Sequence, residues 1–586
     1  MNEKWSLDIL YKGYDDPKFK ADVAKADELI EKEHKLSASL DPNKRKETII
    51  EIIKLREEFE VLASELFHYV SLQCEADTTD EKSAALMGQL MNKYTAITKD
   101  EVMFNKYIGQ TENLDEIIKS DALLSEYEFY LNEIKKDYKH MLSDDVEDMY
   151  AKMDITGGNA WGNMFSYLTS TLEVDYDGKT INLSSVRNLA YDPDKSVRKK
   201  AYEAELAAYK KVESAIAYSL NNIKKQSNMI AKERGYASSL DATLDHSRMK
   251  KETLDALWGA IDEYLPKFEE YMLRKAKILG YKNGLPWFEL FAPIGKMDKK
   301  YTVEEARDML INLFGNFSKD MADMMTRAFD ESWIDFFPRA GKVGGAFCAG
   351  IPSKKQSRVL TNFTGSLSDI DTLAHELGHA YHNLHTQDQR PLNQGYSMPV
   401  AETASTFNEN VFMNFATDNA EGEEKLALLE TQLSDITQTI CDIYSRFKFE
   451  SAVFEECKDA FLFPETLKNL MLKAQKEGYG KGLDPEYLHP YMWACKSHYY
   501  SSGLSFYNFP YAFGALFSKG LYAMYKKEGA SFVPKYQKML LATTVNSVED
   551  TAKTMGIDLT KKDFWRGSLD LVKAQIDEFL ELTKDM

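Results

Sequence analysis

The chain has 586 residues, of which 44% are apolar and 28% are charged, and its formal net charge is −20. This composition excludes a disordered chain, and the length predicts a globular protein of more than one lobe. Because phosphate binding requires a basic surface, the acidic charge argues against nucleic acid and anionic membranes as partners.

Cysteine usage and the N-terminal sequence both favour the cytoplasm. The five cysteines are widely spaced and form no C-x-x-C pair, which fits reduced thiols better than a disulfide framework. The first residues, MNEKWSLDILYKGYDD, lack the apolar core of a signal peptide. No uninterrupted apolar run reaches the roughly 18 residues that a membrane span needs. The sequence therefore predicts a cytoplasmic protein.

Helical periodicity dominates the first half of the chain. Residues 17–150 place apolar side chains at helical spacing, with Glu and Lys on the opposite face. Residues 168–183 instead alternate Thr and Val around Asp177-Gly178, which is a hairpin turn signal. Helical patterning resumes near residue 193 and continues with breaks to about residue 335.

Two glycine-flanked strands, 341–350 and 357–365, are predicted next, and the chain from residue 400 onward is again mostly helical. The predicted fold class is therefore mainly α with one or two small sheets. We expect a division at residue 190, between an N-terminal helical region with a short hairpin (1–190) and a larger C-terminal domain (191–586).

A histidine-rich segment follows the predicted strands: DTLAHELGHAYHNLHT, residues 371–386, holds four of the ten histidines. Ser368 and Asp371 before an apolar run predict a helix start, with Asp replacing the Glu of a capping box. In a helix His375 and His379 point the same way, since four residues give about 40° of rotation and about 6 Å of rise. This spacing suits two ligands of one tetrahedral zinc, and Glu376 of the H-E-x-x-H pattern can reach a water on that metal.

A catalytic zinc also needs a third protein ligand and an open position. VAETASTFNEN opens a second predicted helix, and Glu402 in its first turn can reach the two histidines; the alternative is an acid placed by the helix macrodipole. Asp371 and Glu409 are candidates to accept the second N–H of a ligating imidazole, the alternative being ordinary helix-face acids. His382 and His385 are better interpreted as surface or hydrogen-bonded histidines.

Three blocks of sequence extend these motifs. They occur in the order GGAFCAGIPSKKQSRVLTNFTGSLSDIDTLAHELGHAYH, VAETASTFNEN and HYYSSGLSFYNFPYAFGALFSKGLYAMY. Together they resemble the oligoendopeptidase F branch of the thimet oligopeptidase (M3) family of zinc metallopeptidases, over about residue 160 to the C-terminus. The resemblance implies a two-lobed helical ellipsoid with a small antiparallel sheet near one zinc ion, which lies at the floor of a deep channel. It also implies that residues 191–586 cleave internal bonds of short peptides.

The resemblance assigns roles residue by residue. The motif histidines and Glu402 match the family's zinc ligands, and Glu376 matches its catalytic glutamate. The C-terminal block of the family supplies a histidine and tyrosines that bind the scissile carbonyl. In this chain His498 matches that histidine, Tyr511 best matches the tyrosine and Tyr507 is the second candidate, while one tyrosine position of the thimet branch becomes Asn508.

The substrate backbone must be held extended for cleavage. The segments GKVGGAF and SRVLTNF are candidate edges to which a peptide adds as a strand. Gly344 and Gly345, followed by Ala346, allow a peptide to approach closely, the alternative being an ordinary tight turn.

Other functions and other metals stay open at this point. A related carboxypeptidase or dipeptidyl carboxypeptidase would need a cationic residue to hold the substrate C-terminus, and the sequence does not locate one. A non-catalytic peptide-binding relative is the second alternative. Nitrogen and carboxylate ligands also admit manganese or cobalt in place of zinc.

Overall fold

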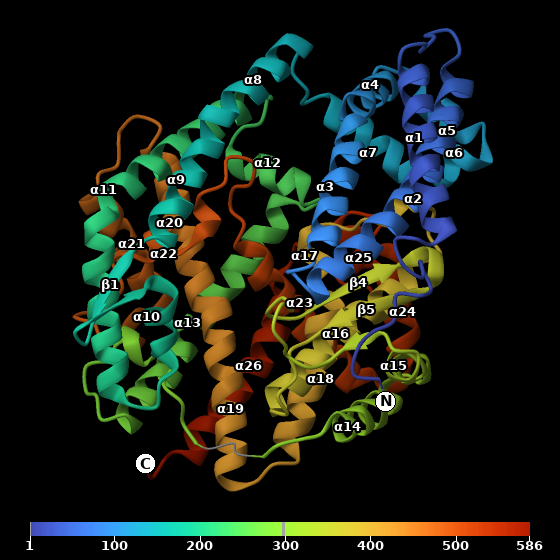
Figure 1. Ribbon diagram of the computed structural model, residues 1–586. Coiled ribbons are helices and arrows are strands. Elements are labelled where there is room, and N and C mark those ends of the chain that lie inside the picture. The colour runs from blue at the N-terminus through green and yellow to red at the C-terminus, as the bar shows by residue number, and fades with distance from the viewer. Residues whose placement is uncertain (1, 296–298) are drawn as a thin grey trace.

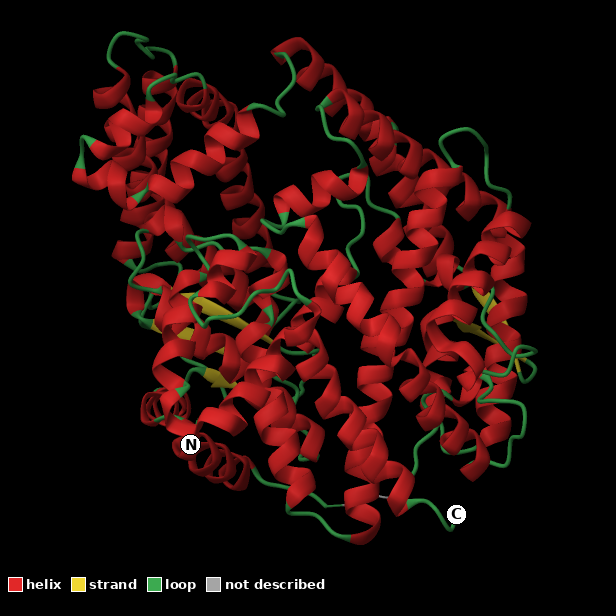
Figure 2. Ribbon diagram, turned by 180° about the vertical axis from the view of Figure 1, so that it is seen from behind, coloured by secondary structure: helices red, strands yellow, loops and turns green. Residues whose placement is uncertain are grey.

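The computed structural model describes residues 2–295 and 299–586, which fold mainly into helices with two small, separate sheets (Figure 1, Figure 2). The predicted mainly α fold class is therefore confirmed. In the part of the chain that the structure describes, no helix is both long enough and apolar enough to cross a lipid bilayer.

The N-terminal helices form a layer of their own at the upper right of Figure 1. Their apolar side chains make hydrophobic clusters separate from the main core. The layer rests on the sheet of the following region, where the ring centroids of Trp5 and Phe347 are 6.2 Å apart. Its helices are α1 (Pro17–Ser37), α2 (Arg45–Ala76), α3 (Glu81–Ala96), α4 (Thr98–Gly109), α5 (Leu114–Lys119), α6 (Ala122–Glu126) and α7 (Glu128–Tyr138).

The next part of the chain contains the predicted hairpin. Asp177 and Gly178 both have positive φ, 49° and 77°, as a two-residue turn between twisted strands requires. Phe165 and Val186, on either side of the hairpin, pack in the same hydrophobic core as the C-terminal helices, and the division at residue 190 stays a prediction. The elements are α8 (Asp144–Thr156), α9 (Gly158–Ser170), β1 (Glu173–Tyr176), β2 (Lys179–Asn182), α10 (Leu183–Asn188), α11 (Lys195–Glu233), α12 (Ser239–His246) and α13 (Lys251–Ile278).

The second sheet has the strand order β3-β5-β4, from β3 (Ile334–Asp335), β4 (Phe347–Ile351) and β5 (Gln356–Leu360). The antiparallel pair β4–β5 was predicted, although both strands are shorter than expected because residues 341–346 form the turn that leads into β4. Strand β3 pairs with β5 in parallel and was not predicted, since two residues give no alternating pattern. Strand β5 is therefore central, and β4 is an edge strand.

Helix α16 follows this sheet and packs against β4, β5 and α18. It begins two residues before the predicted start. Ser366 caps it by accepting the Asp369 N–H at 3.1 Å, and Asp369 accepts the Ser366 N–H at 2.9 Å, so the capping box uses this pair. The elements of this region are α14 (Val303–Phe317), α15 (Lys319–Asp330), α16 (Leu367–Thr386), α17 (Met398–Ala401) and α18 (Thr403–Asp418).

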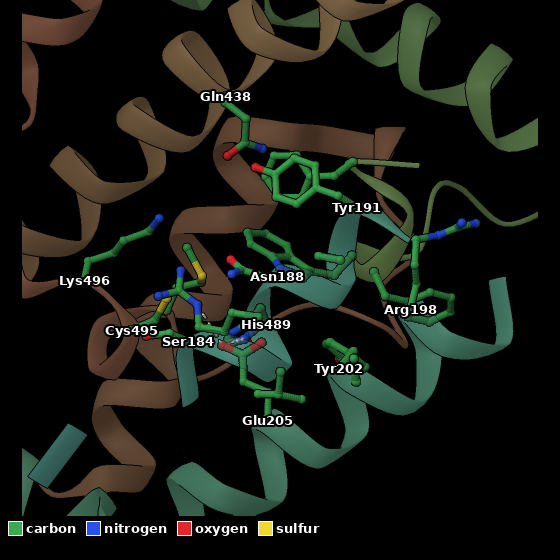
Figure 3. A pocket seen from close by; sticks show the side chains of 18 residues that line it. Ser184, Asn188, Tyr191, Arg198, Tyr202, Glu205, Gln438, His489, Cys495 and Lys496 are labelled. Carbon is green, nitrogen blue, oxygen red and sulfur yellow. Dashed lines mark ion pairs between the residues drawn. The ribbon is translucent and has the colours of Figure 1, made fainter. Parts of the chain in front are cut away.

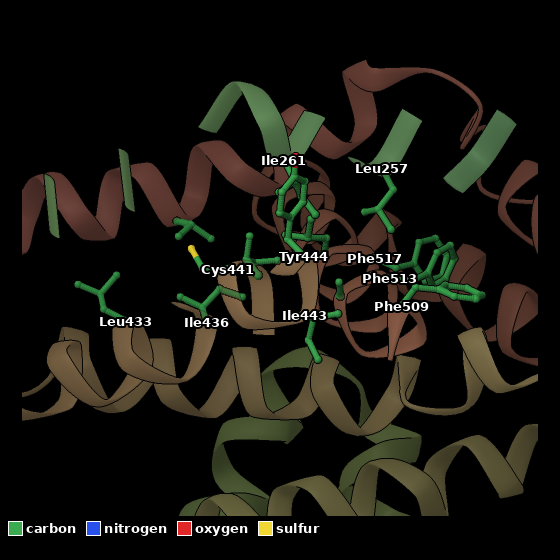
Figure 4. Close-up of a cluster of buried hydrophobic side chains, with 14 of the residues drawn as sticks. Leu257, Ile261, Leu433, Ile436, Cys441, Ile443, Tyr444, Phe509, Phe513 and Phe517 are labelled. Carbon is green, nitrogen blue, oxygen red and sulfur yellow. The ribbon is translucent and has the colours of Figure 1, made fainter. Parts of the chain in front are cut away.

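The C-terminal helices enclose the main hydrophobic core. Figure 4 shows Ile261 of α13 at Tyr444 of a later helix, and Leu257 of α13 near Phe513 of another. This packing fixes α23 relative to α20, and both helices reach the candidate site. The elements are α19 (Gly422–Thr437), a π-helical turn (Gln438–Asp442), α20 (Ile443–Glu456), α21 (Pro464–Tyr479), α22 (Met492–Cys495), α23 (Phe509–Glu528), α24 (Val533–Ala542), α25 (Val548–Lys553) and α26 (Lys562–Leu582).

Candidate active site

Two histidines and one glutamate converge where α16 meets α18. His375 and His379 lie one turn apart on α16, and Glu402 stands between α17 and α18. Oε2 of Glu402 lies 3.4 Å from Nε2 of His375 and 3.2 Å from Nε2 of His379. Ligand atoms about 2.05 Å from a tetrahedral ion lie about 3.3 Å apart. These three atoms are therefore spaced as ligands of a single metal ion.

Hydrogen bonds keep Glu402 ionised and orient the ring of His375. Burial opposes the ionisation of Glu402, but His379 and the Ser405 hydroxyl, 2.7 Å from Oε2, outweigh it and lower the pKa of Glu402 to about 2. Burial also lowers the pKa of His375, but Glu409, 2.5 Å from its Nδ1, outweighs burial and raises this pKa to about 9. Because Glu409 engages Nδ1, Nε2 is the nitrogen that faces Glu402.

Glu376 lies within reach of the two histidines. Its side chain is buried, and among the described residues its Oε2 has no hydrogen-bond partner. Burial raises its pKa, and the neighbouring histidines offset part of that effect. Ligand atoms of His375, Glu376 and His379 lie within 4.8 Å of one another. An unpaired carboxylate of raised pKa beside a candidate metal centre is suited to accept a proton.

The other acids and histidines of the motif differ in what they contact. Of the two acids predicted to hold a ligating imidazole, Glu409 does so. Within the described residues Asp371 hydrogen-bonds neither imidazole, and burial together with the charge of Glu409 raises its pKa. His382 is buried and hydrogen-bonded, with Nε2 2.8 Å from the Thr543 hydroxyl, as predicted. Nε2 of His385 lies 3.7 Å from Asp320 of α15 without a hydrogen bond among the described residues.

The contact between Glu409 and His375 yields a measurable expectation. Glu409→Gln should weaken metal binding about 10- to 100-fold, because the carboxylate that orients the ligating imidazole is lost. Competition against a chromophoric chelator measures the affinity. Asp371→Asn is the matched control, since it neutralises a nearby acid that contacts neither imidazole, and it should bind metal as the wild type does. Wild-type affinity in Glu409→Gln would contradict the role of Glu409.

The C-terminal block brings a histidine and two tyrosines together. The ring centroid of His498 lies 4.7 Å from that of Tyr507 and 6.0 Å from that of Tyr511. On α23, a Cβ added at Gly514 would lie 3.7 Å from Cβ of Glu402, so this helix lies against the metal centre. Glu402 and Tyr511 line one cavity of about 270 Å³. Glu402 of the predicted metal ligands and Tyr511 of the C-terminal block therefore share one cavity.

Asn508 determines how His498 presents its ring. Its Oδ1 lies 3.1 Å from Nη1 of Arg446 and 2.9 Å from Nδ1 of His498. Because an arginine only donates, the amide oxygen must face both groups, and Nδ1 of His498 must carry the proton. Burial, reinforced by the charge of Arg446, lowers the pKa of His498, so the ring is neutral near pH 7 and offers Nε2 as an acceptor. Nitrogen NMR of the His498 ring tests this tautomer, and a protonated Nε2 would contradict it.

The sequence did not reveal every residue of this site. Ser405 stands three residues after Glu402, and helical spacing could have marked it as a partner. Arg446 lies on α20, far from the motifs in sequence, and no pattern marks it. Asn508 was noticed as a departure from the thimet tyrosine pattern, but its contact with Arg446 is visible only in the fold.

The predicted substrate-binding glycines lie at the start of the edge strand. Space is open around Gly344 and Gly345, and Gly345 has φ +83°, which favours glycine. The Asn362 amide donates to the Gly345 carbonyl at 2.9 Å and fixes this turn just before Ala346 and β4. Cys348 of β4 is half-buried, and burial and then the charge of Glu376 raise the pKa of its thiol. The second candidate edge, residues 357–363, was wrong because β5 is covered by strands on both sides.

A helix carrying H-E-L-G-H, a carboxylate at ligand spacing from the start of the next helix and a glutamate with a free oxygen among the described residues are features of the class of metallopeptidases. The model of peptidase family M3 matches residues 188–571, and that of the oligopeptidase F N-terminal region matches residues 110–173. The chain belongs to peptidase family M3. This confirms the predicted family, and with it the prediction that the protein is a metallopeptidase.

Individual relatives cover almost the whole chain. Oligopeptidase PepF of Bacillus subtilis is 25% identical over 96% of this chain and 86% of its own. Group B oligopeptidase PepB of Streptococcus agalactiae is 23% identical over 99% of this chain and 98% of its own. A crystal structure of oligoendopeptidase-F from Enterococcus faecium superposes with a TM-score of 0.71 at 19% identity, covering 97% of this chain and 99% of that one. The crystal structure of a peptidase from Chlamydophila abortus superposes with a TM-score of 0.88 at 21% identity, covering 99% of this chain and 98% of that one.

Proposed function

We propose that this protein is a zinc-dependent endopeptidase that hydrolyses internal bonds of short peptides. The observation that carries the proposal is the position of Glu402 Oε2, at 3.4 and 3.2 Å from the two histidine nitrogens. Two nitrogens and one carboxylate oxygen are a donor set that catalytic zinc uses. Relatives named oligopeptidase and oligoendopeptidase F support peptides as the substrates. The five free cysteines support a cytoplasmic location.

The side chains divide the chemistry among them. When bound by His375, His379 and Glu402, zinc would acidify a water molecule and polarise the scissile carbonyl. Glu376 accepts a proton from the attacking water and passes it to the leaving amine. The hydroxyl of Tyr511 donates to the developing oxyanion.

Two further groups position the substrate. His498, with an acceptor at Nε2, orients a hydroxyl or a substrate N–H and does not itself stabilise the oxyanion. The free edge of β4, together with Gly344 and Ala346 just before this strand, pairs with the backbone of an extended peptide. Backbone pairing reads no side chain, and it suits substrates of varied sequence.

Metal removal tests the proposal directly. The protein should lose hydrolysis of a quenched-fluorescent peptide on dialysis against a chelator and regain it with one zinc ion per chain. Manganese and cobalt are added in parallel, because the same ligands accept them. Full hydrolysis by the stripped protein would contradict the metal-dependent mechanism. Product analysis with peptides blocked at the C-terminus separates internal cleavage from carboxypeptidase activity.

Substrate size is a second expectation. Peptides of about a dozen residues should be cut, and stable folded proteins should not. A folded protein can present an extended strand to the β4 edge only by giving up most of its unfolding free energy, typically about 5–15 kcal/mol. One cleavage sequence is compared in a series of peptides of rising length and in a disordered loop of a folded carrier. Equal rates for the carrier and the short peptide would show that the site is open to proteins.

A further inference from the structure

A second cavity, of about 310 Å³, lies beside the segment that carries His498 (Figure 3). Its walls come from α10, α11, the π-helical turn and the stretch that ends α22. Trp287 and Phe288 form part of its apolar lining. The remaining lining includes a carboxylate, a histidine and several cationic groups, which no step of the proposed hydrolysis uses. A cavity of this size with a few converging polar groups is a candidate ligand site.

One wall of this cavity carries a buried ionic cluster. Oε1 of Glu205 lies 3.5 Å from Nε2 of His489 and 3.4 Å from Nε of Arg187 (Figure 3 marks the ion pairs). His489 is 1% exposed, and among the described residues neither of its ring nitrogens has a hydrogen-bond partner. Buried polar groups without partners are costly in a dry environment. The cluster therefore indicates a cavity suited to a polar ligand.

Lys496 supplies a positive charge that this cluster does not neutralise. Glu205 is shared between Arg187 and His489, and Figure 3 shows Lys496 apart from Glu205 and His489. Within the part of the chain that the structure describes, Lys496 forms no salt bridge and its amine no hydrogen bond. Burial lowers its pKa. Asp442, an acid that favours the charged form of Lys496, is already paired with Arg446. An anionic ligand would therefore stabilise this partly buried ammonium.

The cavity lies next to the catalytic one. Lys496 stands two residues before His498, whose ring faces the two tyrosines. Gln438 lines the second cavity, and Thr439, its neighbour in the chain, lines the cavity of Glu402 and Tyr511. Adjacent Cα atoms are about 3.8 Å apart. An extended peptide rises about 3.3 Å per residue, so a peptide of a few residues has the length to span two neighbouring cavities.

We propose that Lys496 binds a carboxylate of the substrate peptide in this second cavity, and that the C-terminal carboxylate is the usual one. The proposal rests on the proposed function, because the peptide must occupy both cavities at once. Every unmodified peptide carries a C-terminal carboxylate. Anchoring it a few residues beyond the cleaved bond favours short peptides over internal segments of long chains. Gln438, on the adjoining turn, offers an amide donor to the same group.

Equilibrium binding tests this site without turnover. Two peptides of one sequence, a free acid and a C-terminal amide, are titrated into zinc-loaded Glu376→Gln protein. The free acid should bind about tenfold more tightly, since charge-assisted hydrogen bonds are the strong ones. In Glu376→Gln with Lys496→Gln the two peptides should bind alike, and Lys496→Arg should keep most of the difference. Lys481→Gln removes a charge from an exposed position outside the cavity lining and should keep the full difference between the two peptides.

Equal affinity of the acid and the amide for the Glu376→Gln protein would overturn the carboxylate site. Persistence of the tenfold difference in Lys496→Gln would overturn its assignment to Lys496. An amidated peptide with Glu near its end that binds as tightly as the free acid supports the site and identifies a side-chain carboxylate as a second source. None of these results depends on hydrolysis, whereas the proposed function fails if the zinc-loaded wild type cleaves neither peptide.

Discussion

Glu376→Gln is expected to reduce kcat/KM by at least about 10³-fold while the protein keeps one metal ion per chain. Glutamine has the same shape as glutamate but cannot accept a proton from the attacking water. In the proposed mechanism the ion would be held by the two histidines and Glu402, whose atoms are already at ligand spacing. Hydrolysis of a quenched-fluorescent peptide and metal analysis of the same sample give both quantities.

Two comparisons make this result specific. His379→Ala removes a ligand, and it should lose metal together with activity. Retention of more than a few per cent of wild-type activity by Glu376→Gln would exclude Glu376 as the general base. Retained metal in His379→Ala would show that the ion binds elsewhere.

The raised pKa of Glu376 adds a test on the metal-free protein. Burial raises this pKa above the ordinary value of 4.5, so the fold favours the neutral acid. The stabilisation is complete below the unfolded pKa, and it is lost as the pH rises through the folded pKa. Metal-free Glu376→Gln should therefore unfold at a higher temperature than metal-free wild type at about pH 8, and the difference should disappear in acid.

The centre of the site could be predicted from sequence because its geometry is local. A spacing of four residues on one helix fixes the direction of His375 relative to His379, whatever surrounds the helix. Glu402 begins the next long helix, so a single connection decides whether it reaches them. Helical periodicity predicted the fold class for the same reason, since each helix displays its own apolar face.

The parts of the site that the sequence did not predict depend on contacts between distant segments. Arg446 and Asn508 are brought together by the packing of α20 against α23, and no spacing in the sequence reports that contact. This contact makes Nε2 of His498 a hydrogen-bond acceptor, whereas the sequence alone allowed His498 to be an oxyanion donor. The edge of the sheet was assigned to two segments because the two-residue strand β3, which covers β5, has no sequence pattern.

These contacts narrow the choice of oxyanion donor to the tyrosines. Burial and then hydrogen bonding with Tyr507 raise the pKa of Tyr511, which keeps its hydroxyl protonated at neutral pH. Tyr511 is 42% exposed and lines the cavity of Glu402, so a substrate carbonyl can reach it. Tyr507 follows Phe506, which has a φ of 54°. The N–H of Phe506 donates a hydrogen bond to the buried Glu450, and this bond holds the loop in place.

Tyr511→Phe should lower kcat by about 10²- to 10³-fold and leave KM within about threefold, because the hydroxyl meets charge that develops only in the transition state. Tyr507→Phe is the matched control, since it removes the same group from the neighbouring ring. A loss confined to Tyr507→Phe would move the donor to Tyr507. Wild-type kcat in both single variants would contradict a tyrosine donor. His498 could then take the role only as an imidazolium, since its neutral ring offers an acceptor at Nε2. In that case activity should fall as the pH rises through the lowered pKa of His498, and a pH profile flat across that range would exclude His498 as well.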